Sequence, residues 1–298
     1  MDVKTIPKFI FGRRAAIIEV AETKNAFWLA MLFTLSAGFA REYDQEYLLA
    51  EPWYLLLPLV ASLATSFILF CLVRLVTRKH QGKSPPFFES YRIFVTLYWM
   101  TAPLAWIYAI PVERMLSSVE ATNANVTMLS IVAVWRVVLI IRVICVVYEV
   151  RIFDATVVVM LFADTLVLAI ISQLPDKLIA VMSGSNLSDQ DAILATFAKT
   201  VLWYGFFSYP VWFFGTLITW IFGRMRHRAT PLLNNAEQNI SRGCWRVAVG
   251  SILIWAPILI VTQPEQLLKR RIEQNKMTDE IDNTLDWPPV TNDPEYNE

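Results

Sequence analysis

The sequence predicts an all-α fold: a polytopic transmembrane helical bundle of about seven spans, with an N-terminal interfacial helix. Hydrophobic residues make up 56% of the 298 residues and charged residues only 17%, against roughly 45–50% and about 25% in soluble domains. The hydrophobic residues are concentrated in long runs, which is the pattern of membrane-spanning helices. Basic residues gather in alternate connections between these runs.

Residues 1–24 form the first predicted unit, an interfacial or cytoplasmic segment. Residues 6–24 mix apolar and basic positions, and Ile10, Ile17 and Ala21 share a helical face from which Arg13 is excluded. This pattern is typical of a helix that lies in the membrane interface. The alternative is a solvated start of the first span.

Residues 25–264 form the predicted transmembrane helical domain. The run 25–40 reaches only about 24 Å as a helix, against a hydrocarbon core of ~30 Å, so six spans are the alternative if it does not cross. The tail 265–298 is polar and is expected to be largely disordered. The predicted spans are 25–40, 53–76, 93–112, 126–148, 155–173, 196–222 and 244–262.

The distribution of lysine and arginine predicts the orientation. Basic residues are in excess in the N-terminal segment and in the loops after the second and sixth spans, whereas acidic residues are in excess in 41–52, 113–125 and 174–192. Because cytoplasmic loops carry the excess of basic residues, we expect a cytoplasmic N-terminus. The basic run Lys269–Arg271 after the seventh span conflicts with this rule.

Arg136 and Arg142 lie inside the apolar run 126–148, and Asp164 lies inside the next run. A charge at membrane depth is costly and usually has a partner. Counted from the connection near 151–152, Arg136 is about 23 Å deep and Asp164 about 19 Å. We therefore expect an intramembrane polar pair, Arg136 with Asp164. The favoured interpretation is a structural ion pair that fixes helix register, and the alternative is a polar element in a transport path.

Arg142 is expected to act separately from Arg136. Six residues rotate a helical side chain by about 240°, and Arg142 is only about 14 Å from the connection. Its long side chain can extend to the inner surface, where Glu149 lies on nearly the same helical face. We expect an interfacial snorkelling pair, Arg142 with Glu149.

Prolines inside the predicted spans are candidate helix hinges. Pro103, Pro210 and Pro257 each remove a backbone hydrogen bond and tend to kink a helix. Hinged helices around a cavity are one interpretation, and ordinary tolerance of proline in membrane helices is the favoured one.

No pattern in the sequence indicates an enzyme. The two histidines, His80 and His227, fall in loops, and no metalloprotease, nucleophile-elbow or phosphate-binding motif occurs. The three cysteines have no metal-ligand spacing, so no cofactor or metal is expected. The formal net charge is zero, which gives no indication of nucleic-acid binding.

Three segments resemble those of an uncharacterised family of bacterial polytopic membrane proteins that is distantly Yip1-like. They are SAGFAREYDQEYLLAEPW (36–53), YWMTAPLAWIYAIPVER (98–114) and AVWRVVLIIRV (133–143). The resemblance implies that Arg136 and Arg142 are features of that family, and it carries no activity, ligand or catalytic residue over to this chain.

The predicted function is that of a multi-pass protein of a bacterial cell membrane without a catalytic site, acting as a scaffold or assembly factor or in membrane organisation. Its expected partners are the lipid bilayer and a membrane protein or a second copy of the chain. The alternative is a small-solute or lipid transporter with a path between proline-kinked helices.

Overall fold

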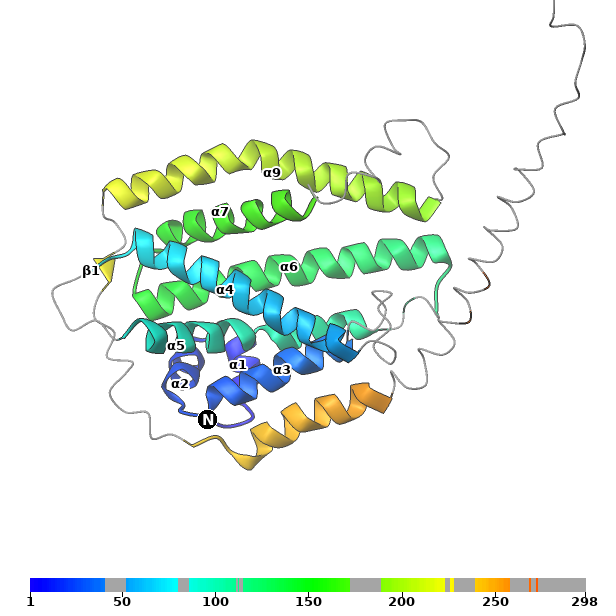
Figure 1. Ribbon diagram of the computed structural model, residues 1–298, viewed down its shortest axis with the longest axis horizontal. Coiled ribbons are helices and arrows are strands. Elements are labelled where there is room, and N and C mark those ends of the chain that lie inside the picture. Colours follow the sequence, from blue (N-terminus) through cyan, green and yellow to red (C-terminus); the bar gives the residue numbers. More distant parts are fainter. Residues whose placement is uncertain are drawn as a thin grey trace, which may run out of the picture.

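The computed structural model describes residues 1–40, 52–79, 86–110, 112, 115–171, 189–222, 226–227, 239–257, 268 and 272. Within these residues the architecture is helical, and long helices pack along one common direction (Figure 1). The predicted tail 265–298 lies outside the described residues apart from positions 268 and 272.

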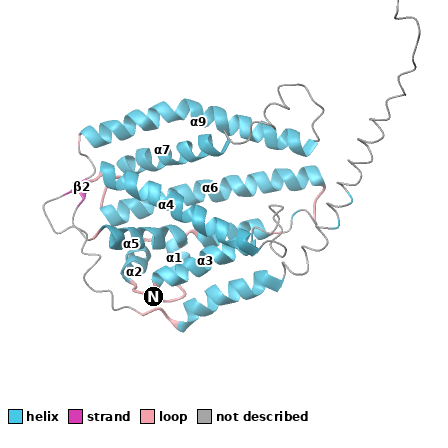
Figure 2. Cartoon of the chain, viewed as in Figure 1, coloured by secondary structure: helices cyan, strands magenta, loops and turns pink. Residues whose placement is uncertain are grey.

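The helices follow the order of the predicted spans (Figure 2). The 3-10 helix η1 leads directly into α4, and η2 follows α5. The α-helices and 3-10 helices are α1 (Thr5–Ile10), α2 (Arg14–Glu22), α3 (Ala26–Ala40), η1 (Pro52–Leu56), α4 (Leu57–Val76), α5 (Phe87–Trp99), η2 (Ala102–Ala109), α6 (Ser118–Tyr148), α7 (Ile152–Ile171), α9 (Asp189–Ile221) and a helix over 242–257.

Four of these helices are long and apolar enough to cross a membrane: Leu57–Val76, Val119–Tyr148, Ile152–Ile170 and Ala192–Ile221. The chain is therefore a membrane protein. Each predicted span overlaps a helical segment, but α3 has 15 residues and α5 has 13. The count of seven spans thus stays a prediction.

The helices alternate in direction, as the distribution of basic residues predicts. The chain reaches the same end of the bundle at the C-termini of α4, α6 and α9 (Figure 1). At this end β1 (Arg78–Lys79) and β2 (Arg226–His227) form a parallel pair, with Arg78 opposite Arg226. The segments that follow α4 and α9 are thus joined at the end of the bundle where the sequence concentrates its basic loops. We call this the basic end.

The prediction of one continuous helix over 6–24 is wrong. The segment forms α1 and α2, separated by a turn in which Gly12 has a φ of 68°. This backbone conformation strongly favours glycine. The large apolar side chains of the two helices are buried or partly buried rather than aligned along one exposed interface, and α2 packs against α5 and α6. Whether the unit lies in the membrane interface stays a prediction.

Two differences at helix boundaries have local causes. The predicted span 93–112 is divided, because α5 ends at Trp99 and η2 begins at Ala102 with Pro103 in its first turn. In contrast, α6 begins before the predicted 126, since the Ser117 hydroxyl accepts from the Glu120 N–H and the Glu120 carboxylate accepts from the Ser117 N–H. Such a capping box satisfies the free N–H groups of the first turn.

Small residues bring α7 and α9 together. A Cβ at Gly215 would lie 3.0 Å from Val157 Cγ1, and the Thr216 hydroxyl donates to the Val157 carbonyl. Close helix approach of this kind is common in membrane bundles. The other side of α9 is exposed. Only 11% of its apolar stretch is buried inside the protein, against 28% to 44% of the corresponding stretches of the other three long helices.

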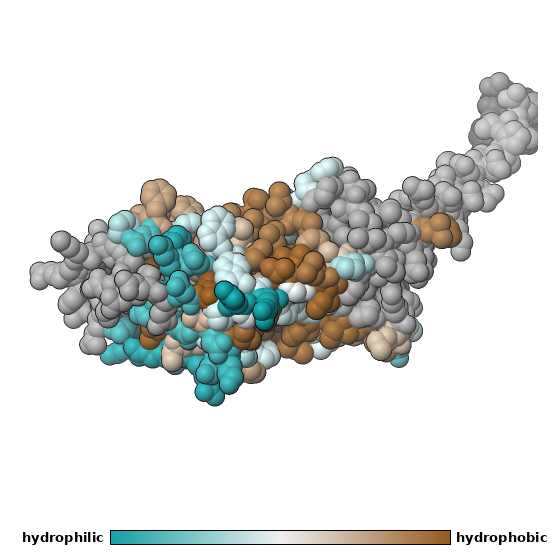
Figure 3. Space-filling view, turned by 90° about the horizontal axis from the view of Figure 1, so that it is seen from below, coloured by the Kyte–Doolittle hydropathy of each residue, from teal (hydrophilic) through white to brown (hydrophobic). Residues whose placement is uncertain are grey.

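Hydrophobic surface dominates the middle of the molecule in the view of Figure 3, and most of its hydrophilic surface lies toward the basic end, at the left. This distribution agrees with a bundle whose central part contacts lipid.

Candidate functional site

Arg136 lies against an aromatic ring rather than a carboxylate. Its guanidinium carbon is 4.8 Å from the centroid of the Tyr98 ring on α5, and its Nε is buried without a hydrogen-bond partner. A cation over a ring face is attracted by the negative charge of that face. The Tyr98 hydroxyl lies 3.3 Å from Thr65 Oγ1 on α4. Arg136 therefore belongs to a contact among α4, α5 and α6.

Asp164 has a different partner again. Its carboxylate accepts a hydrogen bond from the Ser208 hydroxyl on α9, and its exposed fraction is 8%. Among the described residues the ion pairs are those of the Met1 amino group with Glu19 and of Arg14 with Glu149. The predicted Arg136–Asp164 pair is therefore wrong. Similar depth placed the two charges at one level, but Arg136 points toward α5 while Asp164 points toward α9.

Arg142 and Glu149 lie on one cavity but do not form the predicted pair. The Arg142 Nε donates to the Gly12 carbonyl at 3.3 Å, and Arg14 Nη2 lies 3.3 Å from Glu149 Oε1. Both Arg142 and Glu149 are exposed, in agreement with side chains that reach out of the bundle. The N-terminal segment changes the pairing, because it brings Arg14 to Glu149 and a carbonyl to Arg142.

Two side chains of α6 hold the turn between α1 and α2. Trp135 Nε1 donates to the Ile10 carbonyl at 3.1 Å, and Arg142 donates to the carbonyl of Gly12. Because they are seven residues apart, the two donors lie on one helical face. A Cβ on Gly12 would lie 3.2 Å from Arg142 Cγ. The turn therefore needs glycine for its backbone and for its close contact with α6.

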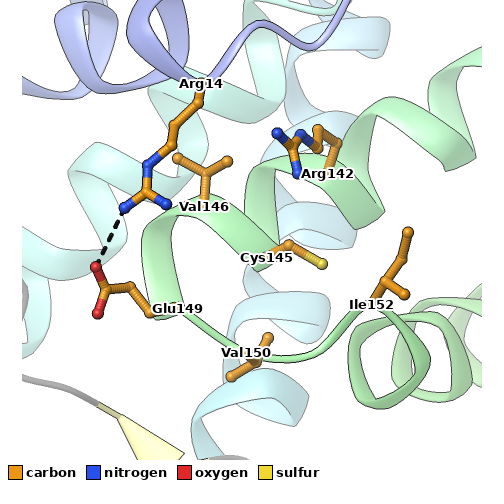
Figure 4. Close-up of a pocket in the computed structure, with 7 residues that line it drawn as sticks. All are labelled: Arg14, Arg142, Cys145, Val146, Glu149, Val150 and Ile152. Carbon is orange, nitrogen blue, oxygen red and sulfur yellow. Dashed lines mark hydrogen bonds and ion pairs between the residues drawn. The ribbon is translucent and has the colours of Figure 1, made fainter.

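The turn, α6 and the start of α7 line two adjoining cavities that are open to the surface, and together we call them the N-terminal groove. The polar cavity has a volume of about 460 Å³ and the apolar cavity about 480 Å³. Arg14 and Arg142 flank the polar cavity with Val146 between them (Figure 4). The polar cavity is lined by Arg14, Arg142, Cys145, Val146, Glu149, Val150 and Ile152, and the apolar cavity by Ile10, Phe11, Gly12, Trp135, Val138, Leu139, Ile141, Arg142, Ile152 and Thr156.

The backbone at the edge of the groove is unusual at Glu149. This residue ends α6 with a φ of 50° and a ψ of 38°, the left-handed conformation. For a residue other than glycine this conformation is uncommon. It begins the three-residue connection (149–151) that turns the chain from α6 into α7, and it sets the carboxylate opposite Arg14.

The three candidate hinge prolines have different positions. Pro103 follows the break between α5 and η2, whereas Pro210 lies inside an uninterrupted α9. Pro257 is the last described residue of the helix over 242–257. A change of helix geometry therefore accompanies Pro103 among the described residues, and hinge motion at any of the three stays a prediction.

No described group of three or more histidine, cysteine, aspartate or glutamate side chains is arranged to hold a metal ion. The cysteines Cys71, Cys145 and Cys244 are all free.

Sequence reasoning missed the residues that complete the site. Arg14, Tyr98 and Ser208 supply the contacts of Glu149, Arg136 and Asp164. The glycine at position 12, between two apolar segments, was an available signal for a turn. The partners of the three charged groups depend on helix rotation, which a depth count does not give.

No protein-family model, no curated protein and no solved structure matches the chain. Its function is therefore inferred from its own geometry.

Proposed function

We propose that the chain is a non-catalytic scaffold of a bacterial cell membrane, with its N-terminus in the cytoplasm, and that it holds a membrane-protein partner or a second copy of itself along α9. The outer face of α9 is the observation that carries this proposal. It is the least buried of the four long helices, so most of its side chains are available for contacts outside the described bundle.

Large aromatic side chains cover this outer face, including its middle. Interfacial belts explain aromatic residues at the two ends of a span, but Phe206 and Phe207 lie near the centre of α9, exposed at 61% and 67%. Such rings contribute large, specific contact areas between proteins. The exposed aromatic residues of α9 are Trp203, Tyr204, Phe206, Phe207, Phe213, Phe214 and Trp220.

The partners of the intramembrane polar groups support a scaffold over a transporter. Arg136 contacts Tyr98 on α5, and Asp164 contacts Ser208 on α9. The two groups therefore serve different helix pairs, whereas a substrate path requires polar groups that converge. The first contact joins α6 to α5, and the second joins α7 to α9.

Site-specific photo-crosslinking in cells tests the scaffold. A photoreactive residue at Phe207 is expected to give a protein adduct of defined mass, either with a partner or with a second copy. The matched control is Val134 on α6, an apolar residue exposed at 65%, which is expected to give lipid adducts only. Lipid adducts alone at both positions would contradict the proposal.

The N-terminal groove supports the alternative, a lipid transporter, because it joins a charged cavity to an apolar one. Transfer of a fluorescent phospholipid between leaflets in proteoliposomes distinguishes the two functions. A scaffold leaves the rate at that of protein-free vesicles. A clear acceleration would favour the transporter and overturn the scaffold.

A further inference from the structure

The geometry points to the N-terminal groove as a binding site for one anionic phospholipid, with the phosphate at Arg142 and Arg14 and an acyl chain in the apolar cavity. This inference does not depend on the proposed role of α9, which lies outside the residues that line the groove.

The charges of the polar cavity favour a singly charged anion. Arg14 forms an ion pair with Glu149, whereas no described carboxylate lies within ion-pair distance of Arg142. The cavity thus contains two guanidinium groups and one carboxylate among its lining residues. One phosphodiester carries the single negative charge that balances the excess. Asp154 is buried in the first turn of α7, where a helix N-terminus favours an acid, and it does not line the cavity.

Arg142 is oriented to bind before a ligand arrives. Its Nε is engaged by the Gly12 carbonyl, which restrains the planar guanidinium. A guanidinium presents several N–H donors in a fixed geometry that suits phosphate oxygens. Because the side chain is exposed, its remaining donors are accessible from the groove.

The apolar cavity distinguishes a lipid from a free phosphate. It shares Arg142 and Ile152 with the polar cavity, so the two lie side by side. It then follows α6 from Arg142 to Trp135, about 10 Å toward the middle of the helix. Phe11 forms part of its wall, with its ring centroid 5.6 Å from that of Trp135. A soluble anion would leave this apolar surface empty, whereas an acyl chain would cover it.

The position of the groove matches that of a lipid headgroup. The polar cavity lies at the C-terminal end of α6, which is the basic end of the bundle. In an anionic leaflet, basic side chains near the surface attract lipid headgroups. The apolar cavity runs from there in the direction that an acyl chain takes from its headgroup.

Native mass spectrometry of the purified full-length protein in detergent tests the site. Dioleoyl phosphatidylglycerol is titrated beside dioleoyl phosphatidylcholine, with glycerol 3-phosphate as a soluble competitor. We expect phosphatidylglycerol to bind at least about tenfold more tightly than phosphatidylcholine, and glycerol 3-phosphate to compete weakly. Equal binding of the two lipids, or equally strong competition by glycerol 3-phosphate, would overturn the inference.

Charge-matched variants locate the binding. Arg14→Gln with Arg142→Gln is expected to lower phosphatidylglycerol affinity to the level of phosphatidylcholine. The control, Arg13→Gln with Arg151→Gln, removes the same charge from two exposed arginines that do not line the groove and is expected to retain binding. The same loss in both double variants would contradict the site.

A second variant tests the acyl chain and does not disturb either arginine. Val138→Trp places a large ring in the apolar cavity, whereas Val134→Trp alters an exposed residue of the same helix outside its lining. Only Val138→Trp is expected to weaken phosphatidylglycerol binding, by several-fold. If the arginine variant does not fold, as checked by circular dichroism, this pair decides the result, and an unchanged affinity for Val138→Trp overturns the inference.

Discussion

Arg136 and Arg142 belong to the same helix, six residues apart, and the structure treats them in opposite ways. Arg136 is half-buried, contacts the Tyr98 ring, and leaves its Nε without a partner. Arg142 is exposed, donates to a backbone carbonyl, and faces a groove. Arg136 joins α6 to α5, and Arg142 presents its N–H donors to the groove.

The difference teaches that depth along a helix does not determine the role of a charged residue. The elements that pack against each face determine it. Tyr98 of α5 packs against Arg136, whereas the turn between α1 and α2 contacts Arg142 through the Gly12 carbonyl and leaves the rest of its side chain exposed. If this contrast is correct, substitutions at the two sites have separate effects on stability and on binding.

The largest expected effect comes from breaking the turn that holds Arg142. Gly12→Val puts a β-branched residue at a φ of 68° and a Cβ 3.2 Å from Arg142 Cγ. We expect it to lower the free energy of unfolding by about 2–3 kcal/mol, and Gly12→Ala to have a smaller effect of the same sign. Denaturation in mixed micelles measures both.

Gly250 provides the control for this prediction. A Cβ added there meets nothing within 4 Å, and the residue lies within a helix. Gly250→Ala is therefore expected to leave stability unchanged or to raise it slightly. A Gly12→Val protein as stable as the parent would show that the turn does not need its left-handed residue.

The second-largest expected effect tests whether the Tyr98 ring stabilises the Arg136 cation. Tyr98→Leu leaves the charge without the ring and is expected to cost about 2 kcal/mol. Arg136→Leu removes both the charge and the unpaired Nε, so its expected cost is smaller, about 1 kcal/mol or less. Tyr98→Phe, which keeps the ring, is the control. The description is wrong if Arg136→Leu destabilises more than Tyr98→Leu.

Hydropathy and charge in the sequence predicted the helices well where one apolar run forms one helix. The predicted spans 53–76 and 155–173 correspond closely to α4 with η1 and to α7. Hydropathy did not show the division of 93–112, because the segments before and after the break are both apolar, although Pro103 marked this position as a candidate hinge. Hydropathy measures transfer into lipid and does not distinguish an α-helix from a 3-10 helix.

The site was predicted less well than the helices, for a physical reason. The sequence identified Arg136, Arg142 and Asp164 as charges inside apolar runs and Glu149 as a surface partner of Arg142, and the structure gives each a specific contact. Their partners come from elements distant in sequence, such as Arg14 for Glu149, 135 positions away. Those contacts depend on how helices rotate and dock, which the spacing along one helix does not specify.

The smallest expected effect separates charge from backbone at Glu149. Glu149→Gln removes the ion pair with Arg14. Because the Glu149 side chain is 31% exposed and that of Arg14 60%, we expect the free energy of unfolding to fall by about 0.5 kcal/mol or less, and by less still at high salt. Glu149→Gly removes the same charge but relieves the left-handed backbone at a φ of 50°, so it is expected to be at least as stable as Glu149→Gln. Denaturation at low and high salt measures both.

Since both substitutions leave Arg14 unpaired beside Arg142, they are also expected to strengthen phosphatidylglycerol binding. Weaker binding in both would show that Glu149 itself holds the ligand.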